Sequence, residues 1–76
     1  MKIDYREMKL DLIRKLNRRL EDACSYKTIG DKALFDISSG RADAIREILE
    51  EYFEFYESDY SEHLQNMIEI VEYEGF

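Results

Sequence analysis

The sequence contains no proline, no tryptophan and only three glycines, at positions 30, 40 and 75. Because proline and glycine are the residues that most often interrupt helices, their scarcity favours long helices. The single cysteine, Cys24, excludes a disulfide within the chain. No run of 18 apolar residues is present, so the sequence predicts no membrane-spanning helix. Asp4 and Glu7 lie where a secretory signal needs an apolar segment, and we therefore expect a cytoplasmic protein.

Positive charge is missing from the C-terminal part of the chain. The last basic residue is Arg46, and residues 47–76 contain ten Asp and Glu, whereas residues 1–46 hold all eleven Lys and Arg with eight acids. This split disfavours an isolated helix, because pairs such as Glu47 and Glu51 are like-charged and one turn apart. We expect the acids to be compensated by the basic half of the chain, by a second copy, or by a basic partner protein.

Apolar residues spaced three or four apart predict one all-α domain over residues 1–76. The expected fold is a small helical bundle of two long antiparallel helices plus a shorter C-terminal helix, possibly dimeric. The first helix is predicted over residues 4–26 with Asp4 as its N-cap, followed by a connection over 25–33 that turns at Gly30. Its apolar stripe comprises Tyr5, Met8, Leu12, Ile13, Leu16, Leu20, Ala23 and Cys24.

The second helix has two possible starting points. It begins either near Asp31 and continues through Gly40, or at Ser39 acting as an N-cap, and we favour the continuous helix. Glycine inside a helix costs about 1 kcal/mol relative to alanine, so we expect another helix to pack closely at Gly40. The stripe of this helix comprises Leu34, Ile37, Ala44, Ile45, Ile48, Leu49, Tyr52, Phe55 and Tyr56.

A break is predicted at Ser58 and Asp59, because Asp59 and Glu62 have the spacing of a capping box. The third helix would cover residues 60–74, with Gly75 just beyond its end. The alternative is one long fused rod, which would require a dimer to cover it. The stripe of the third helix comprises Tyr60, Leu64, Met67, Ile68 and Val71.

Acidic residues form the strongest candidate for a binding site. Glu47, Glu50, Glu54 and Glu57 are spaced 3, 4 and 3 apart, which predicts one ridge on the second helix, opposite its apolar stripe. Such a ridge can imitate a nucleic-acid backbone towards a protein that binds phosphates with Lys and Arg. A solvated surface, or ion pairs with the basic side of the first helix, are the alternatives. The candidate acidic face comprises Glu47, Glu50, Glu51, Glu54, Glu57, Asp59 and Glu62.

Five aromatic residues fall within nine positions and give the second helix an unusually wide apolar arc. We expect them to be buried on two sides, by the rest of the chain and by a second chain, which favours a homodimer over a monomer. These candidate interface residues are Tyr52, Phe53, Phe55, Tyr56 and Tyr60. A candidate basic face on the first helix comprises Arg14, Lys15, Arg18 and Arg19.

No catalytic pattern is visible in the sequence. His63 has no second histidine or cysteine at metal-ligand spacing, and Cys24 has no nearby histidine to activate it. There is no phosphate-binding glycine loop. We therefore expect no metal, no cofactor and no enzymatic activity.

The segment from Ser39 to Glu51 has a small-Gly-basic step that leads into an Ala-x-x-x-Ile-Leu-Glu helix. This pattern resembles that of small accessory proteins of tailed bacteriophages. The resemblance implies a phage or prophage origin and an inhibitor of host machinery, such as a CRISPR effector, a restriction enzyme or RNA polymerase.

From the acidic face and the resemblance together, we expect a non-enzymatic inhibitor that blocks the basic, nucleic-acid-binding surface of a host or defence protein. We expect no direct binding of the acidic half to nucleic acid, and no binding to a membrane. The first alternative is a homo-oligomeric adaptor or assembly protein. The second is a small-ligand binder that sequesters a nucleotide with Arg14, Lys15, Arg18 and Arg19.

Overall fold

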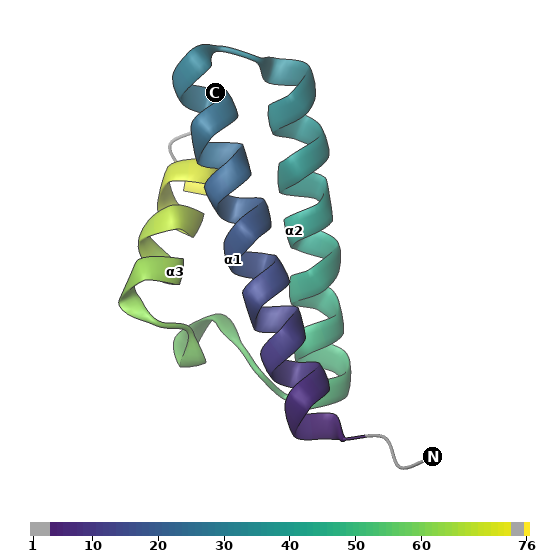
Figure 1. The fold of residues 1–76 in the computed structure, drawn as a ribbon. Coiled ribbons are helices and arrows are strands. Elements are labelled where there is room, and N and C mark those ends of the chain that lie inside the picture. The colour runs from purple at the N-terminus through teal and green to yellow at the C-terminus, as the bar shows by residue number, and fades with distance from the viewer. Residues whose placement is uncertain (1–3, 74–75) are drawn as a thin grey trace.

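The computed structural model describes residues 4–73 and residue 76. In order, the elements are α1 (Tyr5–Ile29), α2 (Lys32–Phe53), a 3₁₀ turn η1 (Glu57–Asp59), α3 (Glu62–Ile68) and a π-helical turn η2 (Glu69–Tyr73). The two long helices run antiparallel, and α3 lies beside α1 (Figure 1). The structure thus confirms the predicted all-α bundle of two long antiparallel helices and a shorter C-terminal helix.

α1 begins as predicted but ends later. The Asp4 carboxylate accepts hydrogen bonds from the backbone N–H groups of Arg6 and Glu7, which fixes the start of the helix. The helix continues to Ile29, so the connection predicted over residues 25–33 is wrong in most of its length. It ends at Gly30, whose φ of 79° is the left-handed conformation that glycine adopts without strain.

A tertiary contact is made by the part of α1 that lies beyond its predicted end. The Lys27 Nζ donates a hydrogen bond of 2.9 Å to the backbone carbonyl of Ile70 in η2. This contact joins the last turn of α1 to the C-terminal helix, and it involves residues that are 43 positions apart. Local sequence patterns therefore could not indicate it.

α2 is continuous, which confirms the favoured alternative. Asp31 is its N-cap and accepts a hydrogen bond of 3.1 Å from the N–H of Leu34. The helix passes through Gly40, but the expected close packing there is wrong. A Cβ atom added at Gly40 would meet no atom within 4 Å, so this glycine faces open space.

The buried stripe of α2 agrees with the prediction at Leu49 but otherwise consists of residues that the prediction left out. The structure buries Phe35, Ser38, Ala42 and Leu49, whereas Ile37 and Ile48 of the predicted stripe are half exposed. Apolar residues cover such a wide arc of α2 that the pattern did not show which part faces the other helices. Packing against α1 and α3 selects one edge of that arc and leaves the other edge in solvent.

The break between the second and third helices is confirmed, but it begins earlier than predicted. α2 ends at Phe53, and Glu54 adopts a left-handed φ of 50°, which is uncommon outside glycine. The predicted capping by Asp59 is wrong, because Ser61 caps α3 by accepting a hydrogen bond of 3.2 Å from the N–H of Leu64. The Asp59 carboxylate instead accepts the N–H of Tyr56 and closes η1.

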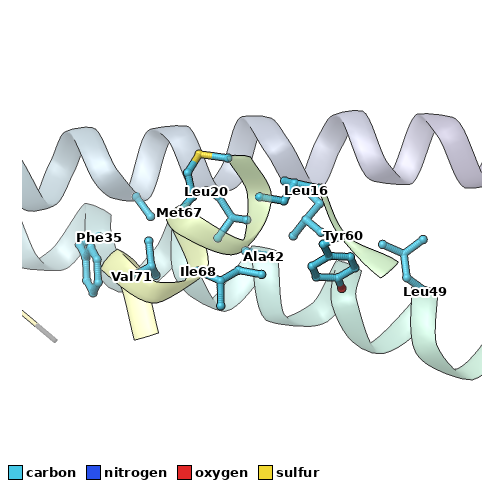
Figure 2. Close-up of a cluster of buried hydrophobic side chains, with 11 residues drawn as sticks. Leu16, Leu20, Phe35, Ala42, Leu49, Tyr60, Met67, Ile68 and Val71 are labelled. Atoms are coloured by element: carbon cyan, nitrogen blue, oxygen red, sulfur yellow. The ribbon is translucent and has the colours of Figure 1, made fainter. Parts of the chain in front are cut away.

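The stripe predicted for the third helix is buried, namely Tyr60, Leu64, Met67, Ile68 and Val71, although α3 itself covers only Glu62–Ile68 of the predicted residues 60–74. These side chains meet Leu16, Leu20 and Ala23 of α1 and the buried residues of α2 in a single core (Figure 2). Position 74, the predicted end of this helix, and Gly75 lie outside the described residues. α3 therefore covers one side of the α1–α2 pair.

Candidate protein-binding faces

Arg46 of α2 forms ion pairs with acidic residues of the C-terminal part of the chain. Its guanidinium pairs with Glu72 of η2 and, at 3.2 Å, with Glu57 of η1; Asp43, one turn earlier, lies 3.9 Å away. The side chain is only 14% exposed, and its Cζ lies 6.0 Å from the centre of the Tyr60 ring. One cation thus joins three elements of the chain.

This arrangement shifts the pKa values of its members. Burial alone lowers the pKa of Arg46, but the hydrogen bond and negative charge of Glu72 outweigh it and raise the pKa above its ordinary value. Partial burial, followed by the neighbouring Glu72 carboxylate, raises the pKa of Asp43 to about 6 against the opposing pull of Arg46. Burial raises the pKa of Tyr60. Arg46 therefore stays charged, while Asp43 is held beside a like charge.

The predicted four-residue ridge on α2 is wrong in its geometry. Because α2 ends at Phe53, Glu57 lies in η1 and turns back to pair with Arg46. Asp59 closes η1, and Glu62 lies in the first turn of α3, away from α2. Of the seven predicted acids, the three last in the sequence are thus separated from the α2 surface.

A different acidic face remains on α2. At 100° per residue, Glu47 and Glu51 lie about 160° from the buried Leu49, so they point directly away from the core. Glu50 on the same helix and Glu54, the C-cap residue that follows its last turn, are also exposed. Within residues 4–73 and 76, these four carboxylates make no ion pair. We call Glu47, Glu50, Glu51 and Glu54 the acidic face of α2.

The predicted interface aromatics do not form one stripe. Tyr52 is 74% exposed and Tyr56 is 49% exposed, whereas Tyr60 is buried. Phe55 is half-buried and packs against Tyr60 with 5.2 Å between ring centres, while Phe53 meets the ring of Tyr5 at 6.4 Å. The early end of α2 divides the group, because residues after Phe53 no longer follow the helical spacing.

The predicted basic residues of α1 do not converge on a common site. Lys15 pairs with Asp11 of the same helix at 3.1 Å, and Arg19 is half-buried. Arg14 borders a shallow surface hollow whose other lining residues are Glu7, Leu10 and Asp11. Arg14 and Lys15 line two different hollows, so the geometry gives no particular support to nucleotide binding.

An apolar groove runs along the seam of α1 and α2. Its volume is about 420 Å³, and its apolar lining comprises Tyr5, Met8, Leu12, Ile48, Tyr52 and Phe53. All residues that line it come from the two long helices, which places it on a part of the seam that α3 does not cover. We call this feature the seam groove. Sequence periodicity had assigned most of its residues to the core.

The remaining chemistry-bearing residues lie apart from one another. His63 is exposed and lies 3.8 Å from Glu21, and Cys24 is half-buried on α1. Within the part of the chain that the structure describes, no group of three or more His, Cys, Asp or Glu side chains could hold a metal ion. None of the described helices is long and apolar enough to cross a membrane.

The sequence pattern did not indicate the ion pair between Arg46 and Glu72. One signal was available: Arg46 is the last cation before a cation-free stretch of thirty residues. Comparison of the chain with protein-family models, curated proteins and solved structures finds no match to any of them.

Proposed function

We propose that this chain is a non-enzymatic binding protein that inhibits a nucleic-acid-binding partner by covering the partner's basic surface with the acidic face of α2. The observation that carries the proposal is the orientation of charge on α2. Arg46 points towards η1 and η2 and pairs with Glu57 and Glu72, whereas Glu47 and Glu51 point outward and pair with no cation among the described residues.

Charge spacing supports this proposal. Consecutive rungs of the acidic face are separated by three or four residues, which is about 5 Å along the helix axis. A protein groove that holds phosphates with Lys and Arg offers cations that can pair with such a row. Association would be accelerated by electrostatic attraction and would weaken as salt rises.

The target class follows from the same chemistry. A basic groove that binds DNA or RNA is the surface to which a row of carboxylates is complementary. Together with the resemblance to phage accessory proteins, this makes a host or defence protein, such as a CRISPR effector, the target that we propose.

The proposal is tested by competition with a nucleic acid. A fluorescently labelled 20-base-pair DNA duplex is bound to each member of a panel of purified DNA-binding proteins, including CRISPR effectors, and its anisotropy is followed as this protein is added. The acidic-face variant carries Glu47→Gln and Glu51→Gln. The matched control carries Glu62→Gln and Glu69→Gln, which removes the same amount of charge from α3 and η2.

We expect at least one panel member to release the duplex at about 50 mM salt, with displacement lost at about 500 mM. The acidic-face variant should displace the duplex several-fold more weakly than the control variant. Equal displacement by both variants would show that net charge, and not the α2 surface, is responsible. Absence of displacement throughout the panel would count against the proposal.

A further inference from the structure

The seam groove is a built, exposed apolar surface that the proposed acidic face does not use. Tyr5 is 67% exposed, Tyr52 is 74% exposed, and Met8 and Ile48 are each at least 40% exposed. Large apolar side chains that gather around a hollow of about 420 Å³ commonly mark a binding surface, unlike single scattered ones. The described residues, 4–73 and 76, leave this part of the apolar surface uncovered.

The shape of the seam groove suits a helix. It lies between two antiparallel helices, and its lining from α1 is spaced as residues 5, 8 and 12, while Ile48 and Tyr52 from α2 are one turn apart. An amphipathic helix that inserts side chains at i, i+3, i+4 and i+7 matches such a surface. A small polar ligand is less suited, because the apolar residues offer only tyrosine hydroxyls to orient it.

Charge at the rim selects the occupant. On the α1 side, the charged residues that line the groove in the described part of the chain are Asp11 and Lys15, which pair with each other at 3.1 Å. On the α2 side, Glu51 is only about 60° around the helix from Ile48. Glu47 lies one turn before Glu51, about 40° from it around the helix. Both carboxylates are exposed and unpaired within residues 4–73 and 76. The α2 side of the rim is therefore acidic, whereas on the α1 side the charges of the two lining residues, Asp11 and Lys15, neutralise each other.

A second copy of the chain is a poorer match than a basic helix. Each copy carries a net charge of −7, so two copies repel each other at low salt. A helix with Lys and Arg beside its apolar face would instead gain from Glu47 and Glu51 while it fills the groove.

We infer that the seam groove binds a basic amphipathic helix of the target protein, with the Lys and Arg of that helix against Glu47 and Glu51. This inference rests on the proposed function, because it supplies the element of the target that the inhibitor holds. The acidic face and the seam groove then form one continuous surface along α2.

The probe is a synthetic 18-residue helix with Leu on one face, Lys on the other and one Trp on the Leu face. Because the protein has no tryptophan, the fluorescence of the peptide alone reports binding. A second peptide has Glu at every Lys position. The protein variants are Ile48→Ser and Met8→Ser in the groove, and Ile37→Ser as a control. Ile37 is 50% exposed on the same helix and does not line the groove.

We expect the Lys peptide to bind the wild-type protein and the Glu peptide to bind at least tenfold more weakly. Ile48→Ser and Met8→Ser should each weaken binding of the Lys peptide about tenfold, which is a typical effect of truncating a central apolar contact. Ile37→Ser should bind like the wild type. The inference is overturned if the Lys peptide does not bind, if both peptides bind equally, or if the groove variants match the control.

Light scattering supplies a separate outcome. If the protein is a dimer at about 50 mM salt and Ile48→Ser converts it to a monomer, a second copy occupies the groove and the inference is wrong. The peptide and duplex experiments also fail independently. Peptide binding without displacement of DNA would support the groove as a helix-binding site and reject the proposed function. Displacement of DNA that Ile48→Ser leaves unchanged would support the proposed function and reject the role of the groove.

Discussion

Replacing Arg46 with alanine removes a cation that joins α2 to η1 and η2. Glu72, whose side chain is 29% exposed, and Glu57, which is 41% exposed, would lose their partner. Glu72 would remain beside Asp43, so two like charges would face each other without the cation between them. We expect the variant to fold but to hold its C-terminal segment less firmly.

The magnitude follows from burial. A fully buried pair costs about 3–5 kcal/mol when one partner is removed, whereas an exposed pair is worth about 0–1 kcal/mol. The Arg46 pairs lie between these limits, because the cation is 14% exposed and its partners are more open. With a contribution of about 0.5 kcal/mol from the Tyr60 ring, we expect a loss of about 2–3 kcal/mol. A domain of this length has a total stability of roughly 4–11 kcal/mol.

The assay is urea denaturation followed by circular dichroism at about 50 mM and about 500 mM salt. A loss of this size shifts the midpoint by roughly 1–2 M urea for a small domain. Arg41→Ala is the matched control, because Arg41 is exposed on the same helix and makes no ion pair within the described residues; its effect should stay within about 0.5 kcal/mol. High salt should recover part of the Arg46→Ala loss by screening the remaining carboxylates.

Arg46→Met distinguishes charge from packing, because it keeps an apolar stem in the same space. In a double-mutant cycle, Arg46→Ala and Glu72→Gln should show a coupling of about 1 kcal/mol. The reasoning is refuted if Arg46→Ala and Arg41→Ala unfold at the same urea concentration, or if Arg46→Met is as stable as the wild type at low salt.

Three further predictions concern backbone, core and pH. Gly40→Ala should stabilise the protein by up to about 1 kcal/mol, because the added methyl group meets open space. Gly30→Ala should destabilise it by about 1 kcal/mol, because residue 30 has a φ of 79°. Melting temperatures that shifted in the same direction for both variants would contradict these two predictions. Ile68→Ala should cost about 2–5 kcal/mol by urea denaturation, because Ile68 is fully buried, and Ile70→Ala, at a site that is 36% exposed, should cost far less. Because the pKa of Asp43 is raised from 3.8 to about 6, its stabilising contribution is present below pH 3.8 and is lost as the pH rises through about 6. Asp43→Asn should therefore be more stable than the wild type at pH 8, by no more than about 1 kcal/mol because the side chain is 64% exposed. A difference in unfolding free energy between variant and wild type that stayed constant from pH 4 to 8 would disprove it.

The helices could be predicted from the sequence because their signals are local. The scarcity of glycine and proline, the N-cap at Asp4 and the turn at Gly30 act within a few residues of the chain. The apolar spacing of the third helix also identified its buried residues correctly, because a short helix with a narrow stripe has only one face to bury.

Only the tertiary structure decided which part of the α2 arc is buried, because a wide apolar arc fits several orientations equally well. It also decided which charged residues pair. Arg46 pairs with Glu72 from 26 positions away, and the left-handed turn at Glu54 directs Glu57 back to the same cation. The sequence by itself determined that the C-terminal acids exceed the cations near them. Packing determined that Glu57 and Glu72 are neutralised within the chain, while Glu47 and Glu51 point outward beside an open apolar groove.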